Sequence, residues 1–220
     1  MSRQARIVIP GQLHHVTQRG NYKQDIFNEN YDRVRYLKYV EEYSRKYKVD
    51  VFAFCLMNNH VHFIVRPHEL WSLASCFGRA HKQYSDYFHQ KQKIKGHLWQ
   101  ERYYSCVLYG DHIPTAIRYV EQNPVRAHMA AEPWHYPWSS ARAHLGKKYR
   151  TITIAEIKEY ISADCWKSFL VEQNRESLVK IIRENTRKGL VAASEEILRD
   201  LERQTGVALM PKQRGRPVGK

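Results

Sequence analysis

Cysteine is scarce and scattered in this chain. The 220 residues contain four cysteines, which stand alone and form no Cys-x-x-Cys pair. Isolated cysteines argue against a disulfide framework and against a zinc knuckle, because both need cysteines at matched spacings. We expect most of them to be small buried core residues. They are Cys55, Cys76, Cys106 and Cys165.

Long apolar stretches are also missing. No run approaches the roughly 20 consecutive apolar residues that a membrane-spanning helix needs. The first residues, MSRQARIVIP, contain no apolar signal core. The sequence therefore predicts a soluble, cytoplasmic protein with no membrane partner.

Acidic side chains are too few to balance the basic ones. The chain has 36 Lys and Arg against 22 Asp and Glu, which gives a formal net charge of +14. Such an excess favours a polyanionic partner, most commonly nucleic acid, over an inert basic surface. With 43% hydrophobic residues, the chain still has enough apolar material for the core of one ordinary domain.

Strand-like and helix-like apolar spacings follow one another along the first part of the chain. A strand, a helix, a hairpin, a second helix, another strand and a third helix are expected. This β-α-β-β-α-β-α order predicts an α+β fold: a ferredoxin-like split βαβ core with an antiparallel sheet, followed by one further helix. The expected elements are residues 12–18, 31–48, 49–57, 60–66, 70–90, 96–108 and 111–123.

The pattern of apolar and charged residues changes after Trp134. Residues 154–205 have mostly helix-like apolar spacing, and the last ten residues contain four basic side chains and no acidic one. We therefore expect a ferredoxin-like domain over 1–150, a helical region over 151–210 and a basic tail over 211–220. A charged tail of this kind is typically disordered when free.

The most informative segment is Asn59-His60-Val61-His62-Phe63-Ile64-Val65. Side chains alternate faces along a strand, so His60 and His62 should share one face while Val61 and Phe63 point into the core. Two imidazoles on one side of a strand are half of a divalent-metal site. Taken alone, the pattern fits an ordinary strand without catalytic meaning equally well.

Another histidine pair, His14-His15, lies in the first expected strand. Successive strand positions face opposite sides, so one of the two must face inward. We expect a buried histidine there rather than a ligand.

A tyrosine and an asparagine near the end of the 111–123 helix strengthen the case for a metal site. Tyr119 and Asn123 are four residues apart, so they share one helical face about 6 Å apart along the axis. If this helix lies beside the histidine strand, Asn123 can supply a third ligand and Tyr119 can hold its hydroxyl near the metal. The alternatives are a packing tyrosine and an asparagine that caps the helix before Pro124.

Cleavage of a phosphodiester by a tyrosine is assisted by a metal site of this kind next to the hydroxyl. A phenol with a pKa of about 10 is a poor nucleophile at neutral pH, and the charged phosphate oxygens repel an anion. A divalent cation held by two imidazoles and an amide can polarise a phosphoryl oxygen and orient the scissile bond for in-line displacement. Mixed nitrogen and oxygen ligands suit Mg²⁺ or Mn²⁺, and zinc would tolerate them.

Four short motifs occur in order: NHVH at 59–62, LWQERY at 98–103, RYVEQNPVRA at 118–127 and YPWSS at 136–140. Together they resemble the REP-associated tyrosine transposases. These are single-tyrosine relatives of small insertion-sequence transposases, within the histidine-hydrophobe-histidine (HUH) nuclease superfamily. The likeness covers about residues 13–145. It implies a ferredoxin-like nuclease core that cuts single-stranded DNA next to palindromic repeat hairpins through a 5′-phosphotyrosine intermediate.

The resemblance also implies a role for each matching residue. His60 and His62 correspond to metal ligands, Tyr119 to the nucleophile and Asn123 to the third ligand, with Mg²⁺ or Mn²⁺ as the divalent cofactor. Related transposases carry a glutamine at the third-ligand position, so the adjacent Gln122 is the alternative. Helical geometry favours Asn123, because position i+4 shares the face of Tyr119.

Basic side chains near these motifs are candidate DNA contacts. Each could pair with phosphate, while neighbouring aromatic rings stack on unpaired bases. In the tail, an Arg-Gly-Arg-Pro segment resembles the core of an AT-hook, which enters the minor groove of A·T-rich DNA, although a generic electrostatic tail is the alternative. The candidates are Arg19, Arg79, Lys82, Arg102, Arg126, Arg214 and Arg216.

Together, the motifs and the charge predict a metal-dependent tyrosine transposase, an endonuclease and strand transferase for single-stranded DNA with repeat hairpins. Two alternatives stay open: a non-cleaving repeat-DNA-binding protein, and a replication-initiator or mobilisation-type nickase of the same superfamily. The short chain and its Asn-Pro-Val-Arg motif disfavour the nickase. The protein is expected to act as a monomer or a homodimer.

Overall fold

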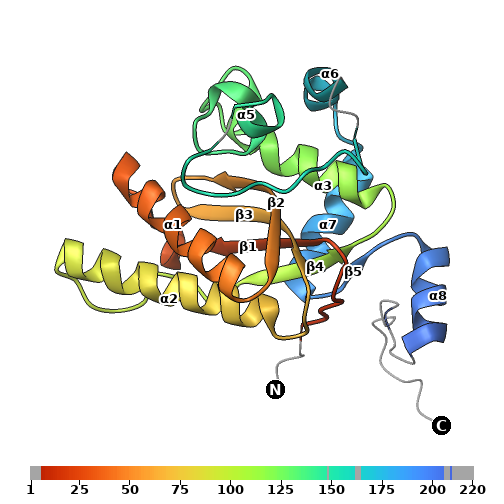
Figure 1. The fold of residues 1–220 in the computed structure, drawn as a ribbon, viewed down its shortest axis with the longest axis horizontal. Coiled ribbons are helices and arrows are strands. Elements are labelled where there is room, and N and C mark those ends of the chain that lie inside the picture. The colour runs from red at the N-terminus through yellow and green to blue at the C-terminus, as the bar shows by residue number, and fades with distance from the viewer. Residues whose placement is uncertain (1–5, 148, 162–164, 206–208, 210–220) are drawn as a thin grey trace, which may run out of the picture.

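The elements expected over the first part of the chain are present in the structure, a computed structural model that describes residues 6–147, 149–161, 165–205 and 209. Their order confirms the predicted β-α-β-β-α-β-α sequence (Figure 1). They are β1 (His14–Arg19), α1 (Asn30–Lys46), β2 (Val49–Leu56), β3 (His60–Pro67), α2 (Ser72–Gln92), β4 (Tyr104–Leu108) and α3 (His112–Glu121).

The strands form one sheet in the order β2-β3-β1-β4-β5. β1 pairs antiparallel with both β3 and β4, and β2 pairs antiparallel with β3. β1 and β2 therefore run in the same direction with β3 between them, which is the split βαβ arrangement. The predicted α+β fold is confirmed, and a short parallel strand, β5 (Val191–Ala192), extends the sheet beyond β4.

Different helices cover the two faces of the sheet (Figure 1). Val61 and Phe63 of β3 belong to the hydrophobic cluster under α1 and α2. Ile64 belongs to the cluster under α3 and a later helix, α7 (Glu176–Lys188). Since side chains alternate along a strand, His60 and His62 share the face of Ile64. The predicted alternation of histidines and core residues is confirmed.

A tight turn follows β1 at Gly20, the last residue of the segment Thr17-Gln18-Arg19-Gly20. A Cβ at this position would collide with the backbone oxygen of Gln24 and the side chain of Ile26, so the close approach requires glycine. Gly20 N donates to Asn59 O at 2.8 Å. The turn thereby holds Arg19 beside the loop that precedes His60.

The strand expected over 96–108 is regular only from Tyr104. The polar run Gln100-Glu101-Arg102 interrupts its apolar pattern, and the residues before it form a loop. Leu98 is buried nonetheless, because the loop packs against the core under α1 and α2. The segment resembles a strand in composition because apolar side chains such as Leu98 are buried, although it is not paired with another strand along its length.

The helix expected over 111–123 ends as α3 at Glu121, and a second short helix, α4 (Asn123–Arg126), follows at once. Pro124 accounts for the interruption, since it lacks the backbone N–H that would continue the α3 hydrogen-bond ladder. Tyr119 and Asn123 thus lie on consecutive helices rather than on one.

The Tyr-Pro-Trp-Ser-Ser motif ties the edge strand β2 to the end of α3. The Tyr136 hydroxyl donates to Leu56 O at 2.8 Å. Ser140 Oγ accepts from Phe54 N at 2.9 Å and also hydrogen-bonds the buried carboxylate of Glu121. These contacts supply hydrogen-bond partners to backbone groups of β2 that have no neighbouring strand on that side, and they hold α3 against the sheet.

Residues beyond 150 share a hydrophobic core with the residues before it. Trp166 and Ile182 are buried in the cluster that contains Ile117 of α3. The boundary predicted between 150 and 151 therefore does not separate two cores. The remaining elements are η1 (Asn21–Lys23), η2 (Pro133–His135), α5 (Ala141–His144), α6 (Trp166–Val171) and α8 (Glu195–Thr205).

Among the described residues, no helix combines the length and apolar character needed to cross a membrane. The predicted basic tail over 211–220, with Arg214 and Arg216, lies outside the described residues. Its AT-hook-like contact stays a prediction.

Two neighbouring isoleucines of α7 test whether this helix belongs to the core. Ile182 is fully buried, whereas Ile181 is 37% exposed. Ile182→Ala should lower the free energy of unfolding by about 2–5 kcal/mol, because it leaves a cavity in the core. Ile181→Ala should cost about 1 kcal/mol or less. Urea unfolding followed by circular dichroism measures both, and equal losses would contradict the docking of α7.

Candidate active site

A cavity of about 600 Å³ opens on the face of the sheet that α3 and α7 cover. β1 and β3 contribute from the sheet, α3 and α4 from one side and α7 from the other. Side chains that are far apart in the sequence meet here. They are His15, Thr17, Arg19, Met57, His60, His62, Gln100, Tyr104, Tyr119, Asn123, Arg126, Ala127, Arg183, Thr186 and Arg187.

The two histidines of β3 are neighbours in this cavity, with ring centroids 5.0 Å apart. Burial lowers the pKa of His60 to about 4, and the positive charges of Arg19 and Arg126 add to this effect. Burial is also the main cause that holds the pKa of His62 well below its ordinary value. Both rings are therefore neutral at pH 7, which is the form that binds metals.

Asn59 holds the ring of His60 in one orientation. His60 Nδ1 lies 2.6 Å from Asn59 Oδ1, which can only accept, so Nδ1 carries the proton. The Asn59 amide is itself oriented, because its Nδ2 donates to Lys23 O at 3.1 Å. The free lone pair of His60 is thus on Nε2.

A third histidine lies beside His62. The sequence predicts a buried histidine in β1, and both His14 and His15 are buried. His15 Nε2 lies 2.9 Å from His62 Nδ1, and the two rings stack with centroids 5.1 Å apart. His14 instead hydrogen-bonds Gln12 O at 2.9 Å through its Nδ1. Only His15 belongs to the cavity.

Tyr119 of α3 lines the same cavity. Its ring meets that of His62 edge-on, with centroids 5.8 Å apart. The Arg126 guanidinium stacks over the tyrosine ring, 4.1 Å from the centroid. Arg183 Nε donates to the Tyr119 hydroxyl at 3.3 Å, and this hydrogen bond is the main cause that raises the pKa of Arg183. A charged donor on this oxygen stabilises negative charge that develops there.

Asn123 caps the end of α3, as the alternative interpretation expects. Its Nδ2 donates to Tyr119 O at 3.1 Å and to Val120 O at 3.2 Å, which leaves Oδ1 as the acceptor. Arg126 Nη2 donates to this Oδ1 at 2.7 Å. Because an amide oxygen has two lone pairs, one is left for a further ligand. Capping and metal binding are therefore compatible with the same side-chain orientation.

Gln122, the alternative third ligand, points away from the cavity. Its Nε2 donates to Leu170 O at 2.7 Å and to Glu172 O at 3.0 Å. Its Oε1 accepts from Asn174 Nδ2 at 2.7 Å. The side chain is engaged by the end of α6 and the residues after it, so the geometry favours Asn123.

The donor set fits a divalent cation. Among the residues that line the cavity, His60 and His62 offer two neutral imidazoles and Asn123 offers an amide oxygen, and this mixture of nitrogen and oxygen suits Mg²⁺ or Mn²⁺. Within the described part of the chain, no group of three or more His, Cys, Asp or Glu residues could hold a metal ion. Asn123 is of another residue type and places an oxygen donor in the same cavity as His60 and His62.

The predicted DNA contacts fall in two places. Arg19 and Arg126 line the cavity, and Arg102 lines a smaller cavity that adjoins it. Arg79 and Lys82 lie on α2, which covers the opposite face of the sheet (Figure 1). A DNA contact by these two stays a prediction, for a part of the DNA away from Tyr119.

Sequence reasoning missed the residues that α7 contributes. Arg183 and Arg187 are one turn apart on an amphipathic helix, a pattern that normally indicates a solvated face. Thr186 lies on the buried side of the same helix. No local spacing connects these residues with Tyr119.

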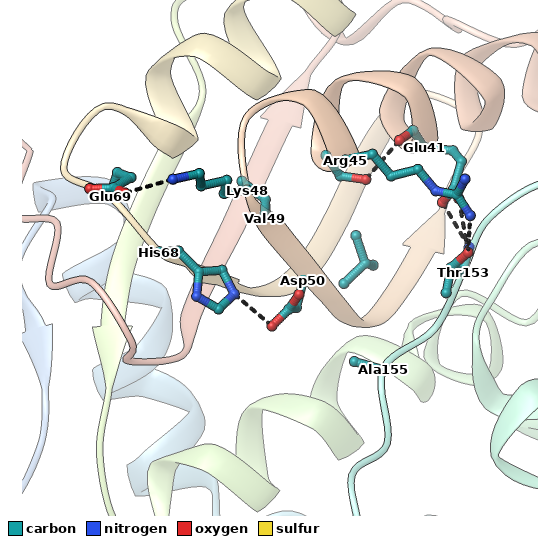
Figure 2. A pocket seen from close by; sticks show the side chains of 11 residues that line it. Glu41, Arg45, Lys48, Val49, Asp50, His68, Glu69, Thr153 and Ala155 are labelled. Atoms are coloured by element: carbon teal, nitrogen blue, oxygen red, sulfur yellow. Dashed lines mark hydrogen bonds and ion pairs between the residues drawn. The ribbon is translucent and has the colours of Figure 1, made fainter.

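A second cavity, of about 670 Å³, lies at the opposite end of β3 from His60 (Figure 2). The acidic side chains that line it are engaged in ion pairs, which account for their presence. We therefore assign no chemistry to this cavity. The pairs are Glu41 with Arg45, Asp50 with Arg66, and Glu69 with Lys48.

Residues 11–123, slightly more than half of the chain, match the family model of IS200-like transposases. The chain belongs to this transposase family. The matched residues include His60, His62, Tyr119 and Asn123. The predicted resemblance to insertion-sequence transposases is confirmed, and membership of the family implies an enzyme that cuts DNA.

Solved structures also resemble this IS200-like transposase. A REP-associated tyrosine transposase bound to a REP hairpin matches with a TM-score of 0.53 and 16% identity, over 71% of this chain and 100% of that one. The likeness shows a shared fold. A protein of Deinococcus radiodurans R1 is 17% identical over 56% of this chain and 97% of its own, but its TM-score of 0.37 is too low to support a shared fold. A search of curated proteins finds no significant match.

The two candidate third ligands of this IS200-like transposase can be distinguished by metal affinity. Asn123→Ala should weaken Mn²⁺ binding by at least about tenfold, because even residues that only support metal ligands have effects of that size. Gln122→Ala removes as many hydrogen bonds, but from a side chain that does not line the cavity, so it should change the affinity less than about twofold. Isothermal titration calorimetry without DNA measures both. The reverse ranking would assign the ligand to Gln122.

Proposed function

We propose that this protein is a metal-dependent endonuclease and strand transferase for single-stranded DNA beside palindromic repeat hairpins, acting through a 5′-phosphotyrosine intermediate. The observation that supports this most directly is the cavity in which Tyr119 lies against His62 and next to the guanidinium groups of Arg126 and Arg183. The net charge of +14 supports a nucleic-acid substrate. The REP hairpin bound to the structural relative supports the choice of hairpin DNA.

Tyr119 is the nucleophile in this proposal. Its hydroxyl oxygen bonds to the scissile phosphorus while the bond from phosphorus to the 3′ oxygen breaks. The phenolic proton is lost and the departing 3′ oxygen gains a proton, so the 5′ phosphate stays on the enzyme and a 3′ hydroxyl is released. Attack by a 3′ hydroxyl of the same or another end reverses the reaction and restores Tyr119.

Two arginines prepare Tyr119 for this attack. Arg183 donates to the hydroxyl oxygen and stabilises the negative charge that forms when the proton leaves. Arg126 stacks on the ring and is buried enough to lower its own pKa. Positive groups in such a sheltered cavity stabilise charge on the reacting phosphate more strongly than they would in water.

His60, His62 and Asn123 are the residues that would hold the divalent cation. The cation would polarise a phosphoryl oxygen and orient the scissile bond. The chain itself keeps both imidazoles neutral and on one face of β3. Arg19 is paired with His60 in the sheet and lines the same cavity, so it can bind a neighbouring phosphate.

Basic residues of α7 mark a path for the strand that leaves the cavity. Arg183 and Arg187 line both the Tyr119 cavity and a neighbouring one of about 680 Å³, which Lys180 also lines. Arg187 further lines the small cavity that contains Arg102. We infer that successive phosphates follow these side chains across α7.

The covalent intermediate provides the test of the nucleophile. A hairpin-flanked single strand incubated with Mg²⁺ or Mn²⁺ should form a covalent protein–DNA adduct, visible as a shifted band on a denaturing gel. Tyr119→Phe should abolish the adduct, because the attacking oxygen is gone. Tyr104→Phe should retain it, although Tyr104 lines the same cavity.

A histidine variant separates cleavage from binding. His60→Ala should reduce adduct formation by at least about a hundredfold, the scale typical of lost electrostatic stabilisation at a reacting group. It should keep most of the DNA affinity, since arginines and lysines supply the phosphate contacts. Binding by the wild type with no adduct under any metal condition would instead support a non-cleaving repeat-DNA-binding protein.

The proposed strand path predicts a change in salt dependence. Arg187→Gln should weaken single-strand binding and reduce the slope of log affinity against log salt by about 0.7, the contribution of one phosphate contact. Arg199→Gln is the matched control, because Arg199 is an exposed arginine of α8 that pairs with Glu195. Fluorescence anisotropy at several salt concentrations measures both slopes. Equal slopes for the two variants would place the strand elsewhere.

A further inference from the structure

Three buried side chains from three elements form a hydrogen-bonded line that ends at His62. His15 Nδ1 of β1 lies 2.8 Å from Thr186 Oγ1 of α7, and His15 Nε2 lies 2.9 Å from His62 Nδ1 of β3. Thr186, His15 and His62 are only 3%, 2% and 6% exposed. Thr186 and His15 are 171 residues apart in the sequence, so only the fold brings them together.

The hydrogen bond made by the Thr186 hydroxyl determines which atom donates in each of the other hydrogen bonds. Thr186 Oγ1 donates to Ile182 O, one helical turn earlier, at 2.7 Å, and a carbonyl oxygen can only accept. With its single proton engaged there, the Thr186 oxygen accepts from His15 Nδ1. Cys106 Sγ lies 3.1 Å from the same oxygen and 3.9 Å from Ile182 O, so its single thiol proton has two acceptors within reach. Burial raises the pKa of the Cys106 thiol to about 12, so it keeps its proton.

The same reasoning assigns the donor and the acceptor between His15 and His62. His15 is only 2% exposed, and burial favours the neutral imidazole, which carries one proton. With that proton on Nδ1, His15 Nε2 is an acceptor. His62 Nδ1 therefore donates, and the free lone pair of His62 is on Nε2. In the opposite arrangement, Thr186 would donate to His15 and His15 would donate to His62. Thr186 would then lose its hydrogen bond to Ile182 O, and His62 would carry its proton on Nε2.

We propose that Thr186 and His15 are positioning residues that fix the tautomer and ring orientation of His62, so that its Nε2 is free to bind a divalent cation. The proposal rests on the proposed function, which names His62 as a ligand. Asn59 has the equivalent effect on His60, so both histidines present the same nitrogen. Thr186 lies outside the residues, 11–123, that match the family model. The α7 helix thus completes a site whose predicted ligands all lie within the matched region.

The tautomer can be measured directly in the metal-free protein. Nitrogen-15 NMR of the histidine side chains distinguishes protonated from unprotonated ring nitrogens. His62 in the wild type should carry its proton on Nδ1, and Thr186→Val should convert it to a mixture of both tautomers. A proton on His62 Nε2 in the wild type would overturn the proposal.

Metal affinity gives an independent measurement. Thr186→Val should weaken Mn²⁺ binding about 10- to 100-fold, the usual effect of losing a group that supports a metal ligand. Thr186→Ser keeps the hydroxyl and should restore most of the affinity. Thr115→Val is the matched control, because Thr115 is 7% exposed and its hydroxyl donates to Asp111 O, one turn earlier, at 2.7 Å.

Calorimetric titration with Mn²⁺ compares these variants, and thermal unfolding confirms that each is folded. Equal affinities for Thr186→Val and Thr115→Val would overturn the positioning role. Failure of the proposed function is seen separately, as a wild type that binds neither Mn²⁺ nor Mg²⁺ and forms no adduct. The tautomer measurement needs no metal and no DNA, so it decides the direction of the line in either case.

Discussion

The antiparallel register between β1 and β3 is the constraint on which the site depends. It pairs Thr17 with His62 and Arg19 with His60, so alternate residues of both strands share one face. His15 is then a diagonal neighbour of His62, within reach of an imidazole ring. A shift by one residue would turn both β3 histidines into the core under α1 and α2. Burial of Val61 and Phe63 in that core opposes such a shift, so hydrophobic packing on one face maintains the chemistry on the other.

The helix α7 links the stability of the fold to the geometry of the site. Its buried side packs Val179 and Ile182 into the core beneath α3. One turn beyond Ile182, Thr186 reaches His15, while Arg183 on the neighbouring side reaches the Tyr119 hydroxyl. The burial that keeps α7 on the sheet therefore also keeps two polar groups at the distances that the site needs. A site supported in this way is preorganised before metal or DNA arrives.

Local patterns predicted the ordered elements and the core of the candidate site. The alternation in His60-Val61-His62 and the four-residue spacing of Tyr119 and Asn123 are properties of single segments, and both side-chain pairs meet in one cavity. The strand expected over 96–108 was too long, because buried aromatic residues in a loop resemble a strand in composition. Arg79 and Lys82 are predicted DNA contacts, and α2 places them across the sheet from Tyr119. The periodicity of a helix shows which of its sides is buried, but not which face of a sheet it covers.

The order of the elements, the shared face of His60 and His62, and the motifs that connect the chain with the insertion-sequence transposases can all be read from the sequence. Alternation along a strand and the spacing along a helix follow from backbone geometry, so they are readable without neighbours. The presence of His15, Arg183 and Thr186 around those residues is seen only in the folded chain. Their meeting depends on strand register and on how a distant helix packs against the sheet. Those are contacts between segments, and no single segment encodes them.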